Sequence, residues 1–350
     1  MVIEWGVFLT ELMSSPVLVA VTLLNIGVVV VNGATDAPNA IATIVGTRCM
    51  SPKAAIILAA VCNFFGLLLI TFVSSAVANT IFKMVDFGGD SQTALLAVMA
   101  AMVAIIVWGA SAWYFGLPTS QSHSLIAGLT GAAIALQGGL AGINGGEWMK
   151  VIYGIVLSTF MGFGLGWLTA KGVAYFFRGF DRRKTDKFFK WAQIGAGAGV
   201  AFMHGAQDGQ KFMGIFILAI SLSTGVGQGV DMSIPVWLMV FCALNMGIGT
   251  AVGGKRIIKS VGMDMVKLEK HQGFAASLSG TVCLVIATFA GLPVSTTHTK
   301  TTAIMGVGAA KRKSAVKWGV AFDMVKTWVL TFPGCGLMGF VFAKIFLLFA

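Results

Sequence analysis

Long hydrophobic runs, separated by short polar stretches, follow one another along almost the whole chain. A helix needs about 20 residues to cross the hydrocarbon core of a bilayer. The runs closest to this length lie at 16–34, 54–79, 93–115, 148–177, 235–253, 272–290 and 318–349. Two shorter runs with internal polar residues occupy 118–137 and 294–309, a longer run at 191–224 is interrupted at 204–211, and the first run continues past a break as 39–47. This pattern predicts ten membrane segments, several of them broken.

The composition supports a membrane protein and argues against the soluble classes. Of the 350 residues, 57% are hydrophobic and 11% are charged, against roughly 25% charged residues in an average soluble domain. A soluble protein of this length would need more charge on its surface. A soluble enzyme, a nucleic-acid-binding protein and a disordered scaffold are therefore poor interpretations, and the composition favours an all-α, multi-pass protein of the cell membrane.

Basic residues are unevenly shared between the predicted loops. With the N-terminus outside, the inner loops contain 17 Lys and Arg, whereas the outer loops contain two, Lys83 and Lys150. Cytoplasmic loops of membrane proteins carry such an excess. The distribution predicts that both termini face out and that the basic stretch 178–190 is a cytoplasmic linker.

Two polar motifs occur twice. Asn-Gly-Ala-Thr-Asp-Ala-Pro-Asn (32–39) aligns with His-Gly-Ala-Gln-Asp-Gly-Gln-Lys (204–211), and Gly-Leu-Pro-Thr-Ser-Gln-Ser-His (116–123) aligns with Gly-Leu-Pro-Val-Ser-Thr-Thr-His (291–298). The offsets are 172 and 175 residues, and the order of the motifs is preserved. A chance match between Gly/Ala-rich helices is the alternative, but the matched residues are the polar ones.

This recurrence predicts two repeats, 1–177 and 191–350, joined by the linker 178–190. Each half contains five predicted segments, and an odd number inverts the second half relative to the first. Inverted-topology repeats with broken helices at the membrane midplane are a frequent plan of secondary transporters.

An aspartate occupies the same position in both members of the first motif pair. A charge at membrane depth costs roughly 2.5–3.5 kcal/mol on insertion scales, so Asp36 and Asp208 call for an explanation. Thr35 and Asn39 flank the first aspartate, and Gln207 precedes the second. A carboxylate with neutral oxygens suits a hard cation such as Na⁺, and a proton-carrying pair or an ion-paired packing role are the other interpretations.

The second motif pair is rich in hydroxyl groups and is expected to begin two helices inside the membrane. Pro118 and Pro293 suit a first helical turn, and Ser or Thr suits an N-cap. Such a helix start presents unpaired N–H groups and a positive dipole end, which together bind oxyanions. Ordinary capping of two short helices is the alternative. The hydroxyl residues are Thr119, Ser120, Ser122, Ser295, Thr296 and Thr297.

At these motifs the sequence resembles the inorganic phosphate transporter (PiT) family. NGATDAPNAIAT and HGAQDGQKFMGI resemble its two aspartate motifs, and GLPTSQSHSLIAG and GLPVSTTHTKTTAIMGVG resemble its two P-x-S-[ST]-[ST]-H segments. The final WVLTFPG (328–334) continues the likeness. The resemblance implies inverted repeats with extracellular termini, and symport of inorganic phosphate with Na⁺ or H⁺.

The motifs and the resemblance together predict three groups of site residues. The phosphate-binding group is Thr119, Ser120, Gln121, Ser122, Ser295, Thr296, Thr297 and Lys211. The cation-coupling group is Asp36, Asn39, Asp208, Gln207 and Thr35. The supporting group is Asn32, His123 and His298. No catalytic residue, metal site or cofactor is expected besides the coupled cation, and a homo-oligomer is left open.

Three other functions remain open. Sulfate transport on the same scaffold is one, although phosphate can donate a proton to a carboxylate at neutral pH and sulfate cannot. An intramembrane hydrolase is another, but no Gly-x-Ser-x-Gly turn accompanies the histidines. A channel would need no coupled cation. Of the remaining charges at membrane depth, Asp323 and Lys326 are expected to pair on one helix, and Lys300 is either a cation near the anion or a residue that reaches toward an interface.

Overall fold

The structure, a computed structural model, describes residues 4–88, 90–115, 119–225, 234–252 and 265–349. Within these ranges the chain is helical and contains no β-strand, which confirms the predicted all-α class. The α-helices are α1 (Trp5–Ser14), α2 (Pro16–Thr35), α3 (Ala37–Gly46), α4 (Pro52–Val73), α5 (Ala76–Lys83), α6 (Ser91–Phe115), α7 (Gln121–Gln137), α8 (Gly145–Phe176), α9 (Arg182–Ser223), α10 (Val236–Val252), α12 (Lys270–Phe289), α13 (Thr296–Lys311) and α14 (Trp318–Phe346).

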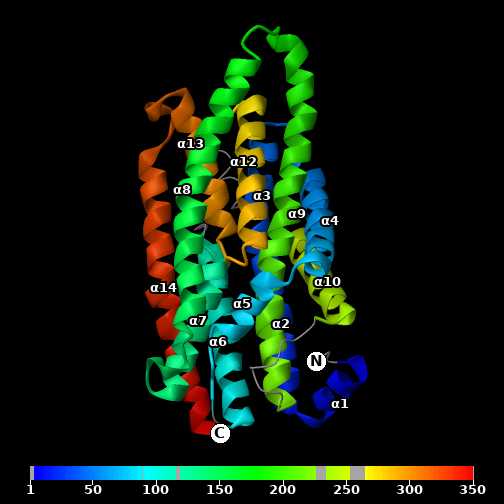
Figure 1. The fold of residues 1–350 in the computed structure, drawn as a ribbon, viewed down its shortest axis with the longest axis vertical. Helices are drawn as coiled ribbons and strands as arrows, with labels where there is room; N and C mark the ends of the chain where they lie inside the picture. The colour runs from blue at the N-terminus through cyan, green and yellow to red at the C-terminus, as the bar shows by residue number, and fades with distance from the viewer. Residues whose placement is uncertain (1–3, 89, 116–118, 226–233, 253–264, 350) are drawn as a thin grey trace.

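Most of the long helices follow the long axis of the molecule, which gives it two distinct ends (Figure 1). Helix α1 and the last turns of α14 lie at one end, here called the terminal end, and the turn between α8 and α9 lies at the other. Basic residues gather at this second end, here called the basic end. Arg182 and Lys311 both pair there with Glu269, at 2.5 and 3.4 Å.

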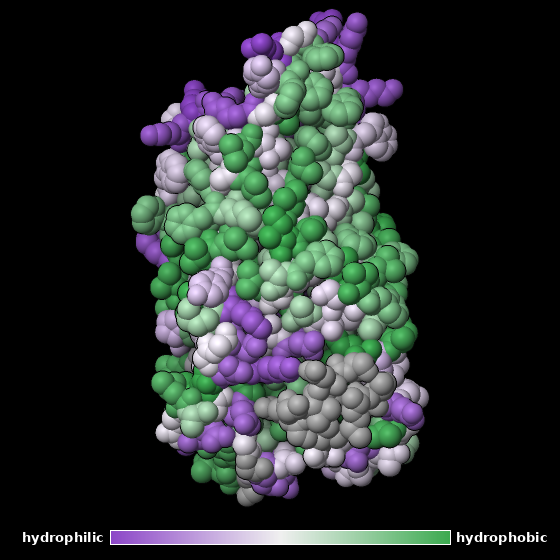
Figure 2. Space-filling model, viewed as in Figure 1, coloured by the Kyte–Doolittle hydropathy of each residue, from purple (hydrophilic) through white to green (hydrophobic). Residues whose placement is uncertain are grey.

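The surface between the two ends is apolar. Large hydrophobic side chains such as Ile57, Phe160 and Leu330 are more than half exposed on α4, α8 and α14. Figure 2 shows hydrophobic atoms over the middle of one face, hydrophilic atoms at the basic end, and further hydrophilic atoms toward the terminal end. Six helical stretches in the described ranges are long and apolar enough to cross a membrane: Pro16–Gly46, Pro52–Val73, Ser91–Phe115, Gly145–Phe176, Lys270–Phe289 and Trp318–Phe349. The protein is therefore a multi-pass membrane protein.

The structure corrects the predicted segments at three places. The run 54–79 is divided at Ser74, an extended residue that ends α4 before α5 begins. Hydroxyl side chains compete with the helical backbone for hydrogen bonds, which favours such an end. The stretch 178–190, predicted as a linker, is helical from Arg182 onward, because the Asp181 side chain caps the first turn of α9.

The third correction concerns the second aspartate motif, where a break was predicted. Helix α9 is continuous through 204–211, whereas α2 ends at Thr35 and α3 begins at Ala37. Proline explains the difference. Pro38 has no N–H group to donate and clashes with the preceding turn, whereas Gln210 occupies the corresponding place in α9.

The prediction that a proline occupies the first helical turn was wrong for α13. Pro293 lies in the extended segment before α13, outside the first turn, and Ser295 is the N-cap. Helix α7 likewise begins after its N-cap Ser120, while Pro118 lies outside the described residues. The serine caps themselves agree with the prediction.

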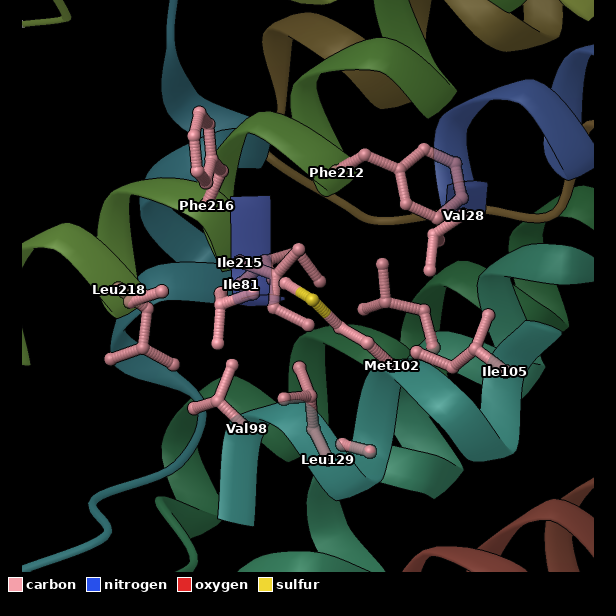
Figure 3. Close-up of a cluster of buried hydrophobic side chains, with 14 of the residues drawn as sticks. Val28, Ile81, Val98, Met102, Ile105, Leu129, Phe212, Ile215, Phe216 and Leu218 are labelled. Atoms are coloured by element: carbon pink, nitrogen blue, oxygen red, sulfur yellow. The ribbon is translucent and has the colours of Figure 1, made fainter. Parts of the chain in front are cut away.

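A large apolar cluster fills the interior on the terminal side of these helix starts. It combines side chains of α2, α5, α6, α7 and α9. Figure 3 shows Met102 in this cluster, with Ile215 and Phe216 of α9 and Leu129 of α7 around it. The chain break at Asp36, the starts of α7 and α13 and the middle of α9 meet next to this cluster.

Candidate functional site

Two helix starts with the same geometry border the candidate site. The Ser120 Oγ accepts a hydrogen bond from the His123 N–H at 3.3 Å, and the Ser295 Oγ accepts one from the His298 N–H at 3.1 Å. Both serines are buried. Each cap satisfies one N–H group of its first turn, and a helix leaves four such groups without intrahelical partners. The predicted helix starts therefore exist, and their positive dipole ends face the protein interior.

Asp208 and Lys211 form an ion pair that is completely buried in the middle of α9. The Lys211 Nζ donates to Asp208 Oδ1 at 2.7 Å, to Ser122 Oγ at 2.7 Å and to the Val294 carbonyl at 2.5 Å. Its three donors are thus used on α9, on the first turn of α7 and on the segment before α13. The lysine links both helix starts to the aspartate.

The second oxygen of Asp208 accepts from both halves of the chain. Asn32 Nδ2 and Thr296 Oγ1 each donate to Asp208 Oδ2 at 3.2 Å. His204 Nε2 also lies 3.2 Å from this oxygen, and its Nδ1 is hydrogen-bonded to Asn63 at 3.0 Å. This carboxylate is compensated by one cation and several polar hydrogens, as a buried charge requires.

Asp36 is buried as deeply but is compensated much less. Its carboxylate accepts a hydrogen bond from the Gln121 N–H, at 3.3 Å, and none of the described Lys or Arg side chains forms an ion pair with it. Asn39 donates to Thr297 Oγ1 at 2.9 Å, which leaves its own carbonyl oxygen buried without a partner, as is that of Asn32. Within the described residues, the surroundings of Asp36 thus combine a carboxylate without an ion pair and two neutral amide oxygens without donors.

The two predicted supporting histidines are in contact. The rings of His123 and His298 meet edge to face with centroids 4.4 Å apart, and none of their four nitrogens has a hydrogen-bond partner among the described residues. Phe332 packs against His123, and Trp328 stacks on His298. Both aromatic residues come from WVLTFPG, so this segment of α14 covers the histidine pair.

The remaining predicted residues lie nearby but make other contacts. The hydroxyl of Thr35 donates to the carbonyl four residues earlier in its own helix. Gln207 donates to the segment before α13, and the Gln121 amide lies against Gly109 of α6. Thr119 is buried beside the cap of α7. The roles of all these residues in binding stay predictions.

Some buried polar residues near the site were missed in the sequence. Asn63, which contacts His204, also donates a hydrogen bond of 2.8 Å to the Thr250 hydroxyl. The Ser277 hydroxyl of α12 is hydrogen-bonded to both Thr43 and Lys300. Each is a single polar residue inside a long apolar run, which was the available signal. By contrast, Asp323 and Lys326 form the expected pair, and both side chains are exposed.

A bundle with an apolar surface and an enclosed polar centre between broken helices is the architecture of a membrane transport protein. The model of the phosphate transporter family matches residues 32–184 and 177–339. The chain belongs to the phosphate transporter family, and phosphate is the substrate class that this membership supports.

Individual relatives agree with this assignment. A Bacillus subtilis protein named "Probable low-affinity inorganic phosphate transporter" is 40% identical over 309 residues, which cover 88% of this chain and 91% of the relative. A Rhizobium meliloti protein of the same name is 37% identical over 324 residues, covering 92% and 94%. A solved structure titled "The sodium-dependent phosphate transporter" has the same fold, with a TM-score of 0.87, 22% identity and coverage of 96% of this chain and 100% of that chain.

Proposed function

We propose that this protein carries inorganic phosphate into the cell in symport with a cation, Na⁺ or H⁺, by alternating access. The observation that carries the proposal is the buried network joining Asp208, Lys211, Ser122 and Thr296 to the starts of α7 and α13. Helix starts and hydroxyls replace the hydration of an oxyanion, and a buried lysine adds the opposite charge.

The network offers a physical basis for coupling. Asp36 accepts from the first N–H of α7, and Asp208 accepts from Lys211 and two hydroxyls. A phosphate at the two helix starts needs these same donors. A cation bound to the carboxylates would release them, so that cation and anion each favour the binding of the other. Such reciprocity is what linkage requires of two coupled ligands.

The coupling cation is proposed to bind on the Asp36 side. Asp208 already has Lys211 three residues later, whereas Asp36 has Asn39 at the corresponding position. The carbonyl oxygens of Asn32 and Asn39 are buried and unpartnered. A carboxylate with neutral oxygens suits Na⁺, and the carboxylate alone suits a proton. The "sodium-dependent" title of the neighbour in fold favours Na⁺ as the first cation to test.

The packing supports the proposed inverted repeats. Contacts of α2 with α6 and α10 have counterparts in contacts of α9 with α12 and α4, and α7 with α14 has its counterpart in α13 with α8. We propose that these two halves, 1–177 and 191–350, rock about the central site, with the basic end in the cytoplasm. Tags at residues 183 and 312 should then react only from inside, and tags at either terminus only from outside.

Uptake of labelled phosphate into proteoliposomes tests the proposed function. Purified protein is reconstituted, and a Na⁺ or an H⁺ gradient is imposed separately. Accumulation above the external concentration under one gradient supports symport and identifies the cation. Uptake that only equilibrates would indicate a channel, and stronger competition by sulfate than by unlabelled phosphate would indicate the sulfate alternative.

The hydrolase alternative is tested on the same preparation. The relatives reported above are named as transporters, and the proposed function requires no bond cleavage. Release of products from a labelled membrane peptide, without phosphate uptake, would support the hydrolase instead.

A further inference from the structure

We propose that Lys300, with Ser277 and Thr43, forms a second oxyanion subsite, one helical turn from the central site toward the basic end. The ligand is inorganic phosphate in transit, so this inference rests on the proposed function. The three residues come from α13, α12 and α3, and all are buried. None of them belongs to the acid–lysine network around Asp208.

Lys300 is a buried cation without a counter-charge. Its side chain is 1% exposed, and its Nζ donates to Ser277 Oγ at 2.8 Å. In the residues that the structure describes, no carboxylate lies within ion-pair distance of this amine. Ser277 Oγ also lies 3.0 Å from Thr43 Oγ1. A buried ammonium group has a large desolvation cost that a bound anion would offset.

The stem of the Lys300 side chain packs against α12. A side chain at Gly280 of α12 would meet the Lys300 stem, since an added Cβ would lie 3.7 Å from its Cδ. The stem therefore passes beside Gly280 of α12. The amine is thereby held at Ser277, one turn away on the same helix, and does not reach toward an interface.

The subsite continues the central site by helical spacing. Asn39, Thr43 and Thr47 follow one another four residues apart in α3, so they share one face. Asn39 is bonded to Thr297 at the central site, and Thr43 belongs to the subsite. On α13, Lys300 lies one turn beyond Thr296, the residue that donates to Asp208. An anion leaving the helix starts toward the basic end meets Lys300 next.

Beyond Lys300 the polar lining reaches the basic end. Gln193 of α9 is fully buried with both amide atoms unpartnered, and it lies beside Thr47 at Gly273. Thr47 in turn lines a cavity of about 460 Å³ at the basic end, which Arg182 and Lys270 also line. Phosphate would therefore pass from the central site to Lys300, then to Gln193 and Thr47, and then to this cavity.

Transport and binding measurements on the full-length protein separate this subsite from the central one. Lys300→Met removes the charge and keeps an apolar stem, and Lys300→Arg keeps the charge. Lys326→Met is the matched control, because Lys326 is exposed and pairs with Asp323. Initial uptake rates at saturating phosphate are measured in proteoliposomes, and the affinity for inorganic phosphate is measured by calorimetry on the same preparations.

We expect Lys300→Met to lower the uptake rate by about tenfold or more, the loss expected for one charged hydrogen bond in transit. Its equilibrium affinity should stay within roughly threefold of the parent, because the central donors are untouched. Lys300→Arg should restore most of the rate, and Lys326→Met should match the parent. Unchanged uptake by Lys300→Met would overturn the subsite, as would an affinity loss as large as the rate loss.

Two neutral variants keep the test decisive if Lys300→Met does not yield a monodisperse protein. Ser277→Ala and Thr43→Val remove only hydroxyls, and each should lower the rate by about threefold with little change in affinity. Parent-like rates in both variants would reject the subsite. Failure of the parent protein itself to accumulate phosphate would instead reject the proposed function, so the two failures are distinguishable.

Discussion

The two sides of the central site carry different chemistry at positions that the sequence offsets make equivalent. Toward the basic end these positions hold Thr43, Ser277 and Lys300. Toward the terminal end their counterparts, at offsets of 172 and 175 residues, are Ile215, Met102 and Leu125. All six residues are buried. Met102 and Ile215 lie within the apolar cluster of Figure 3.

This difference shows that a repeated scaffold does not repeat its chemistry. The terminal side is closed by close-packed apolar side chains, which exclude water and ions. The basic side keeps hydroxyls, an amide and an amine in its interior. The same holds at the centre, where Asp208 has Lys211 as a partner and Asp36 has Asn39 at the equivalent position. At equivalent positions of the proposed repeats, the two sides therefore carry different side chains.

The largest effect is expected at the two aspartates. Asp36→Asn and Asp208→Asn should each abolish concentrative uptake, a loss of roughly a hundredfold or more, because the amide lacks the negative charge that balances a coupling cation and cannot carry a proton. The measurement is the phosphate accumulation ratio in proteoliposomes under the driving gradient. Asp323→Asn is the control, since Asp323 is exposed and pairs only at the surface.

The two aspartate variants should also differ in stability. Asp208→Asn leaves Lys211 without its carboxylate, so this variant should also lose stability, whereas Asp36→Asn should not, because Asp36 has no ion pair to break. Full accumulation by Asp36→Asn would remove the coupling role from the first half of the chain.

The next prediction concerns a lysine introduced among the apolar side chains of the terminal side. Leu125→Lys puts an amine at the counterpart of Lys300, inside the apolar cluster. We expect the free energy of unfolding to fall by about 3 kcal/mol or more, because nothing there solvates the charge. Denaturant unfolding in detergent measures this, with Leu125→Met as the volume-matched control. Normal stability of Leu125→Lys would show that the terminal side is also hydrated.

The sequence predicted the long helices well because most of them are long apolar runs with polar boundaries. It missed the continuity of α9, since two similar eight-residue motifs differ in the one residue that breaks a helix, Pro38. It also joined α4 and α5 into the single run 54–79, because Ser74 is only a short interruption in an apolar run. Local patterns define elements, and single residues decide where they end.

The sequence named the residues of the candidate site but not the hydrogen bonds that join them. The motif pairs named both aspartates and the hydroxyl segments, and the structure brings these together. The contact of Thr296 with Asp208 crosses 88 residues, and that of Asn32 with Asp208 crosses 176. Spacing along one chain cannot reveal such pairings. The subsite at Lys300 escaped for the same reason, because Ser277 and Thr43 become neighbours only after folding.

A smaller effect is expected for the hydroxyls at the two helix starts. Ser122→Ala and Thr296→Val should each weaken phosphate affinity by about ten- to a hundredfold, since a hydrogen bond to a charged group is worth roughly 1.5–3 kcal/mol. Calorimetry with inorganic phosphate measures this on purified protein. The conservative change Arg183→Lys in the basic stretch should leave the affinity unaltered. Parent-like affinity in both hydroxyl variants would move the anion site elsewhere.

The smallest effect is expected when the N-cap serines of α7 and α13 are removed. It tests whether the two helix starts are equally stabilised. The caps of α7 and α13 have nearly the same geometry, with Ser120 and Ser295 accepting from the third residue at 3.3 and 3.1 Å. Removing an N-cap serine costs about 1 kcal/mol. Ser120→Ala and Ser295→Ala should therefore lower the free energy of unfolding equally, by about that amount, while Ser111→Ala on an exposed turn of α6 should not. Both caps precede the positions where the two helices differ, Leu125 in α7 and Lys300 in α13. Equal losses of unfolding free energy would show that the two helices differ only after their first turn. A clearly larger loss at one cap would show that the two helix starts already differ before any phosphate binds.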